Sequence, residues 1–269
     1  PDAFVRISGV KVKVVVYDIY PLREDYGVAP ILLSVLREMA RDTDIVVEYS
    51  ADVLSEVSLT DKRIEDALEK TDADLLVFGS YVATRSNVQP LIHLICTYGR
   101  QMEPSADLPE GMDINRAIQE GDAILQMPRH ILLREIMPVM AIETMSFQNM
   151  LAEEIFLIAQ FIQAVKLYKA EKFEETAQMA GAILGSLGSP DQWPGYWVPF
   201  SYLHMLNGLA YLRMGNTQAA VFTLSNALTR STPAKARIQR CAEQIIASLM
   251  RAQEQASETE KPAEAPAPG

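Results

Sequence analysis

The residues best placed to do chemistry are three carboxylates near the start of the chain. Asp18 follows a β-branched run at residues 12–17, and Glu24 and Asp25 come shortly after it. Open α/β sheets place ligand and catalytic groups at the carboxyl end of a first parallel strand, and such a cluster could hold Mg²⁺. The alternative is structural: Asp18 caps a turn, and the other two meet the positive end of a helix dipole. We prefer it because no lysine or Ser/Thr constellation completes a site.

Other signatures of catalysis are missing from the sequence. Neither a G-x-x-x-x-G-K-[ST] string nor a G-x-G-x-x-G after the first strand is present to cradle phosphate. The metal spacings H-E-x-x-H and paired C-x-x-C are also missing. His93 and Cys96 lie three residues apart on an expected strand, so their side chains point to opposite faces. We therefore expect no enzyme, no catalytic residue, no cofactor and no metal.

The two cysteines, Cys96 and Cys241, lie far apart in the chain. Cys96 sits in an apolar run, which predicts a small buried hydrophobic side chain rather than a reactive thiol. A disulfide between the two stays open on the sequence alone, although no pattern indicates one.

A cluster of aromatic side chains is the best candidate for a contact with a partner. It lies in a proline-containing stretch and comprises Trp193, Tyr196, Trp197, Phe200 and Tyr202. One interpretation is that this loop folds back into a groove between helices. The other is an exposed contact surface, since aromatic residues dominate interface hot spots.

The totals restrict the class of protein. The chain has 269 residues, of which 49% are hydrophobic and 22% charged, a composition typical of ordered domains. The formal net charge of −11 repels phosphate backbones, so we expect no nucleic-acid binding. No apolar run approaches the ~18 residues that a membrane-spanning helix needs, so we expect no direct membrane insertion.

The first hundred residues alternate between strand-like and helix-like patterns. Runs at residues 12–17, 44–49, 74–82 and 90–98 read as strands, and amphipathic stripes at 28–39 and 60–68 read as helices. The order is β-α-β-α-β-β, which predicts an α/β domain with a mixed sheet. The first three strands should be parallel because helices connect them, and the last two should form a hairpin.

Only helical patterns follow a polar, turn-rich linker at 103–113. The expected helices cover residues 114–126, 131–143, 147–170, 173–187, 202–214, 217–229 and 234–255. Residues 257–269 are rich in Pro, Ala and Glu and predict a disordered tail.

Residues 208–228 resemble a tetratricopeptide (TPR) repeat. Gly208 permits close packing of two helices, Gly215 and Asn216 make the turn, and Ala220 and Ala227 let the second helix approach. A second, less complete copy lies 44 residues upstream. The resemblance implies an all-α domain of TPR-like helical hairpins that binds proteins. Such arrays need about three repeats or a supporting neighbour, so other helices or the α/β domain must supply support.

The first hundred residues resemble the TolB amino-terminal-like domain of bacterial proteins. The residues that carry the resemblance are the strands at 12–17 and 45–49 and the segment 73–81, with its alanine-aspartate, apolar strand and glycine-serine string. That domain precedes TPR repeats in proteins of signalling or envelope contexts. The resemblance implies a role in assembly or partner recognition rather than a reaction.

These observations divide the chain into an α/β domain at 1–102, a linker at 103–113, a TPR-like helical domain at 114–256 and a tail at 257–269. We expect a non-catalytic scaffold or assembly protein that binds a protein partner, with self-association as one form. The alternative is a regulatory module that senses a small molecule at the strand ends, near Asp18, Gly79 and Ser80. A metal-dependent enzyme is a third interpretation. A cytoplasmic location is expected, with an upstream membrane anchor or an envelope location left open because the chain begins at Pro1.

Overall fold

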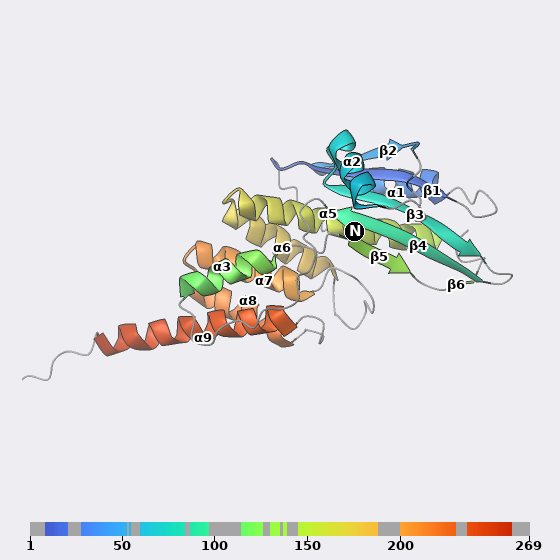
Figure 1. Ribbon diagram of the computed structural model, residues 1–269. Helices are drawn as coiled ribbons and strands as arrows, with labels where there is room; N and C mark the ends of the chain where they lie inside the picture. Colours follow the sequence, from blue (N-terminus) through green and yellow to red (C-terminus); the bar gives the residue numbers. More distant parts are fainter. Residues whose placement is uncertain are drawn as a thin grey trace, which may run out of the picture.

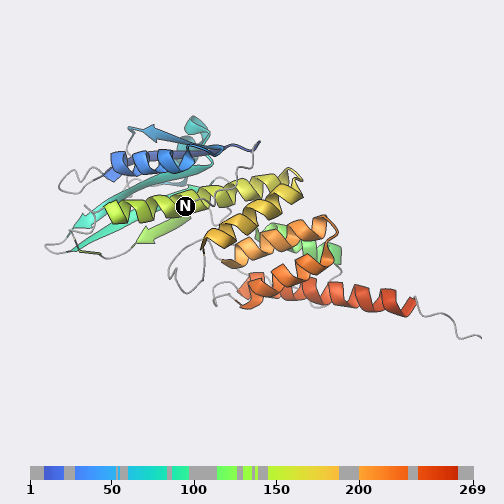
Figure 2. The same cartoon turned by 180° about the vertical axis from the view of Figure 1, so that it is seen from behind.

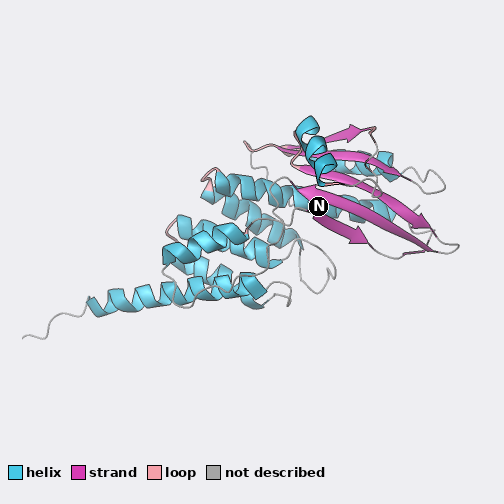
Figure 3. Cartoon of the chain, in the orientation of Figure 1, coloured by secondary structure: helices cyan, strands magenta, loops and turns pink. Residues whose placement is uncertain are grey.

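The computed structural model describes residues 9–20, 28–52, 54, 60–83, 87–96, 114–125, 130–134, 137–138, 145–187, 200–229 and 236–259. The strands are β1 (Val12–Tyr20), β2 (Ile45–Ser50), β3 (Leu75–Ala83), β4 (Asn87–Cys96), β5 (His130–Arg134) and β6 (Met137–Pro138). The helices are α1 (Val28–Ala40), α2 (Asp61–Thr71), α3 (Ile114–Ile124), α5 (Met145–Lys169), α6 (Phe173–Leu187), α7 (Phe200–Arg213), α8 (Thr217–Thr229) and α9 (Ala236–Thr259). Figure 3 shows the strands gathered at one end of the molecule and most of the helices at the other.

The strands form one mixed sheet in the order β2-β1-β3-β4-β5, with β6 paired to β4. β1 lies parallel to both β2 and β3, whereas β4 is antiparallel to β3 and to β5. The predicted β-α-β-α-β-β order of the first hundred residues, its three parallel strands and its closing hairpin are thus confirmed. The parallel pairs follow from the helical crossovers, which return the chain to the same end of the sheet.

The side chains of β1 divide between two cores on opposite faces of the sheet. Val14 and Val16 join the larger core, which α1 and α5 cover, while Val15 and Tyr17 join a smaller core with α2. The two-residue alternation of a strand produces this division. Figures 1 and 2 show the same arrangement from both sides, with α2 on one face and α1 and α5 on the other.

Helix α5 joins the sheet to the helical part of the molecule. It contacts α1 and β1 and also α6 and α7. Its central residues, from Ile155 to Val165, are all buried, so the larger core continues from the sheet into the helices. This all-round burial is typical of a central helix rather than a surface one. The short helical array was expected to need a supporting neighbour. Two helices outside the array provide one: α1 packs on α5, and α3 packs on α7 and α9.

The expected helix at 131–143 is wrong. His130–Arg134 forms β5 instead, paired antiparallel with β4 so that His93 lies opposite Leu132. Short apolar runs fit a strand or a helix equally by periodicity, and the open edge of β4 supplies partners for the backbone. The chain therefore leaves the sheet for α3 and then returns to it. Helix α9 also runs to Thr259, so residues 257–259 are helical and not part of the tail. The linker at 103–113 and residues 260–269 lie outside the described residues.

The later helices match the prediction closely. The expected helices at 147–170, 173–187, 202–214 and 217–229 correspond to α5 to α8, and that at 234–255 to α9. Each helix from α5 to α9 contacts the next along the chain, which makes two successive hairpins and a closing helix. α9 lies on the side away from the sheet, and its C-terminal part extends past the other helices (Figures 1 and 2).

The turns within the two hairpins have the same geometry at a separation of 44 residues. The backbone N–H of Lys172 donates to the Leu167 carbonyl at 3.0 Å, and that of Asn216 donates to the Tyr211 carbonyl at 2.9 Å. The residue before each donor has a left-handed backbone, with φ of 60° at Glu171 and 75° at Gly215. This is the Schellman-type helix end, in which the left-handed residue reverses the chain.

Close packing of α7 on α8 depends on Gly208, as predicted. A Cβ atom there would lie 2.6 Å from Leu224 Cγ, inside a fully buried contact. Ala220 and Ala227, the small residues expected on the facing helix, are both fully buried. Small side chains at these points let the two helix backbones approach.

Candidate functional site

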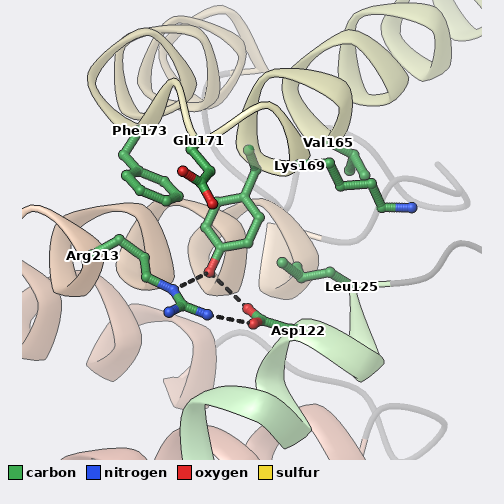
Figure 4. A pocket seen from close by; sticks show the side chains of 8 residues that line it. Asp122, Leu125, Val165, Lys169, Glu171, Phe173 and Arg213 are labelled. Atoms are coloured by element: carbon green, nitrogen blue, oxygen red, sulfur yellow. Dashed lines mark hydrogen bonds and ion pairs between the residues drawn. The ribbon is translucent and has the colours of Figure 1, made fainter. Parts of the chain in front are cut away.

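A hollow of about 260 Å³ opens where α3, the α5–α6 turn and the end of α7 meet. Its walls combine apolar and charged side chains from all three places (Figure 4). The lining residues are Asp122, Leu125, Val165, Tyr168, Lys169, Glu171, Phe173 and Arg213.

Three of the lining residues form a closed hydrogen-bonded network. The Tyr168 hydroxyl donates to Asp122 Oδ1 at 2.7 Å. Arg213 Nη2 donates to Asp122 Oδ2 at 2.7 Å, and Arg213 Nε lies 3.3 Å from the Tyr168 hydroxyl oxygen. The network joins α3, α5 and α7 through a charge-assisted pair, the stronger kind of hydrogen bond.

Local sequence explains how these side chains meet. Gly121 has no side chain, and a Cβ there would lie 3.0 Å from Leu209 Cδ2, so α3 lies close to α7 and brings Asp122 within reach. Tyr168 lies in the last turn of α5, and Arg213 is the last residue of α7. A positive charge at the end of α7 is also favourable toward the helix dipole.

Tyr168 and Arg213 hold fixed protonation states near neutral pH. Burial raises the pKa of Tyr168 above its ordinary value, and the hydrogen bond to Tyr168 raises the pKa of Arg213. The tyrosine therefore keeps its proton and the arginine its charge. An acid or base that works near neutral pH needs a pKa close to it, so Tyr168 and Arg213 are suited to holding a geometry rather than moving a proton.

The rest of the hollow is an apolar wall with charges at its edge. Leu125 and Val165 are each 3% exposed, and the Phe173 ring packs edge-on to Tyr168 with 5.4 Å between ring centroids. Glu171 and Lys169 add one charge of each sign. With Asp122 and Arg213 included, the formal charges in the lining cancel.

A second polar cluster fastens α5 to the sheet. Lys166 Nζ lies 2.9 Å from each carboxylate oxygen of Asp74 and donates to the Lys11 carbonyl at 2.7 Å. Asp74 also accepts from the backbone N–H of Lys13, and Gln163 Nε2 donates to the Val10 carbonyl. Asp74 belongs to the 73–81 string that carries the TolB-like resemblance, and its role in this structure is to hold strands and helix together.

The residues of the expected ligand site, Asp18, Gly79 and Ser80, lie where the later parts of β1 and β3 run side by side. β1 and β3 pair Ile19 with Gly79 and Tyr20 with Ser80, with a bulge between Val16 and Ile19. The bulge turns Ile19 into the core and leaves Asp18 half-buried, consistent with the extra residue that a bulge inserts. Gly79 is needed because a Cβ there would collide with the Leu91 carbonyl oxygen.

Glu24 and Asp25, the other two members of the expected acidic cluster, lie outside the described residues. Within the described ranges, no group of three His, Cys, Asp or Glu side chains is placed to hold a metal ion.

The aromatic cluster is described only in part. Trp193, Tyr196 and Trp197 lie outside the described residues, and Phe200 begins α7. Tyr202 is half-buried, and its ring meets that of Phe161 edge-on at 6.5 Å. Tyr202 thus packs on α5 as part of α7, and both interpretations of the aromatic loop stay predictions.

His93 is almost fully buried, at 3% exposed, and its ring stacks on Phe78 at 4.9 Å. Cys96 and Cys241 are both buried, and no disulfide joins them. Cys96 thus packs as a small hydrophobic residue, as predicted.

Comparison with known proteins finds no matching family model and no curated protein similar enough to count as a match. The resemblances to the TPR repeat and to the TolB amino-terminal-like domain therefore stay predictions. Among the helices that the structure describes, none is both long and apolar enough to cross a lipid bilayer.

The sequence analysis did not identify Asp122, Tyr168 and Arg213 as a group. One signal was available: Lys169 and Arg213 occupy the same position 44 residues apart, so a basic residue ends the first helix of each hairpin. No feature of the sequence singled out Asp122. The repeat does not include α3, and a lone carboxylate on an amphipathic helix usually lies on the solvent-facing side.

Proposed function

We propose that the protein is a non-catalytic interaction or scaffold protein, in which TPR-like hairpins stacked on an α/β domain bind a protein partner. The observation that carries the proposal is the repeated hairpin. The turns at Glu171 and Gly215 share one hydrogen-bond pattern, 44 residues apart, and α7 and α8 meet through Gly208. Stacked hairpins of this kind present extended surfaces, which is how repeat proteins bind their partners.

The chemistry of the partner follows from charge. A net charge of −11 attracts a positively charged surface and repels acidic ones, so a basic protein fits best. The aromatic cluster of Trp193, Tyr196, Trp197, Phe200 and Tyr202 is the proposed contact, with self-association as one form of the interaction. No cofactor, nucleic acid or membrane insertion enters this proposal, and the proposed location is cytoplasmic.

The test is the mass of the full chain by light scattering over a range of concentration and salt, alone and with basic test proteins. Mass growth that Trp193→Ala and Trp197→Ala abolish supports the proposal. Phe222→Ala is the matched control, because Phe222 is 72% exposed on α8 and outside the cluster. A constant monomer mass in every mixture, the same in both tryptophan variants, would overturn it.

A further inference from the structure

Two charged groups in the hollow beside Tyr168 have hydrogen-bonding capacity left over. Arg213 uses Nε and Nη2 within the network, and its Nη1 has no protein acceptor in the described part of the chain. The Glu171 side chain makes no hydrogen bond or ion pair with any described residue. One donor and one acceptor of opposite charge therefore line the same hollow, with Glu171 at its exposed edge.

The two charged groups come from different elements around the hollow. Arg213 ends α7 and has its Nε 3.3 Å from the Tyr168 hydroxyl oxygen, whereas Glu171 lies in the α5–α6 turn. Figure 4 shows the Arg213 guanidinium beside Asp122. Leu125 and Val165 border the same space. A hollow with a few placed charges on an otherwise apolar surface is the usual form of a small-molecule site.

We propose that this hollow binds a small zwitterion with an apolar side chain, of the class of free amino acids. The ligand carboxylate would accept from Arg213 Nη1. Its ammonium would meet the Glu171 carboxylate and the Tyr168 ring, which attracts a cation by its quadrupole. The apolar side chain would cover Leu125 and Val165. This inference does not rest on the proposed scaffold function, and either can fail alone.

Two properties of the hollow, its charge and its volume, select this class over others. The formal charges of its lining cancel, so a ligand with a single charge leaves either the Glu171 carboxylate or Arg213 Nη1 without a partner. At about 260 Å³ it lies below the ~300–1,000 Å³ range of drug-sized sites, which limits the ligand to a small molecule. A residue inside a peptide chain lacks both terminal charges, and a chain end has only one of them.

The experiment is calorimetric titration of the full chain with leucine, methionine and phenylalanine, compared with N-acetyl-leucine and leucine methyl ester. Each blocked derivative lacks one charge and should bind at least about tenfold more weakly than leucine, since a hydrogen bond to a charged group is worth that much. The proposal is overturned if no free amino acid binds, or if the blocked derivatives bind as tightly as leucine.

A pair of variants then locates the site. Glu171→Gln keeps the shape of the side chain and removes the charge, and we expect it to weaken leucine binding by at least about tenfold. Glu174→Gln is the control, because Glu174 is exposed in the first turn of α6 and does not line the hollow. Equal leucine affinity in both variants would reject the assignment. Melting curves of the ligand-free variants show whether both remain folded.

Discussion

Lys166 Nζ lies 2.9 Å from both carboxylate oxygens of Asp74, so a lysine of α5 forms an ion pair with the residue that precedes β3. The same ammonium donates to the Lys11 carbonyl, and Asp74 accepts from the Lys13 backbone N–H. The pair is largely enclosed, with side chains 21% and 14% exposed. The sheet and the helices are thus joined by these polar contacts as well as by the continuous core.

Lys166→Met should lower the free energy of unfolding by about 1–3 kcal/mol, because it leaves Asp74 partly buried without its cation. Asp74→Ala should cost more, since it also deprives the Lys13 N–H of its acceptor. Urea denaturation measures both. Lys70→Met is the control: its ion pair with Asp52 is exposed, at 70% and 59%, and should be worth less than ~1 kcal/mol. If Lys166→Met lowers the free energy of unfolding no more than Lys70→Met does, the Lys166–Asp74 pair does not stabilise the junction.

Glycine substitutions should separate close contacts from open helix surface. Gly208→Ala should destabilise by about 1–2 kcal/mol, because overpacking against the buried Leu224 outweighs the gain in helix propensity. Gly181→Ala and Gly185→Ala in α6 should each stabilise by about 0.5–1 kcal/mol, since a Cβ at either meets nothing within 4 Å. Thermal melts of the three variants provide the measurement, and a stabilising Gly208→Ala would contradict the packing of α7 on α8.

Patterns local to one element predicted much of the fold. The helices α5 to α8 and the parallel strands β1 to β3 follow from periodicity and from the glycines and prolines that bound them. The prediction at His130–Arg134 failed because a short apolar run fits a helix or a strand equally well. Only pairing with the distant edge of β4 decides between the two. The bulge after Val16 was likewise invisible, because it depends on how β1 pairs with β3.

The hollow could not be predicted for a related reason. Its three hydrogen-bonding residues are separated by 46 and 45 positions in the chain, and they meet through the packing of α3 on α7. Sequence reasoning singled out Asp18 as a chemical candidate from a local signal, its place after an apolar run, although it preferred a structural role for that residue. Gly121 allows the close approach of α3 to α7, but the sequence does not show this, because it depends on the contact with the distant Leu209.

Both turns of the repeat should be more stable with glycine at the left-handed position. Glu171→Gly should stabilise the protein by about 0.5–1 kcal/mol, because a non-glycine residue pays for its left-handed backbone. Gly215→Ala should destabilise by about the same amount for the converse reason. Urea midpoints of both variants measure the pair. Changes of the same sign would show that the two turns are not equivalent.

The protein should lose stability in alkali through Tyr168. Burial raises the pKa of Tyr168 above its ordinary value of 10.0, so the native state keeps a proton that the unfolded chain has released. The free energy of unfolding should therefore stay level below about pH 10 and fall as the pH rises beyond it. Urea midpoints between about pH 8 and about pH 11 measure this, since that interval brackets the ordinary tyrosine pKa.

Tyr168→Phe is the matched variant, since it keeps the ring against Phe173 and removes only the titrating hydroxyl. It should be less stable near neutral pH by about 1–3 kcal/mol, because Asp122 and Arg213 lose a hydrogen-bond partner. Its stability should then fall less steeply above about pH 10. Some slope should remain, because burial also raises the pKa of Tyr17. Parallel pH profiles for the two proteins would show that the Tyr168 hydroxyl is not held in the network.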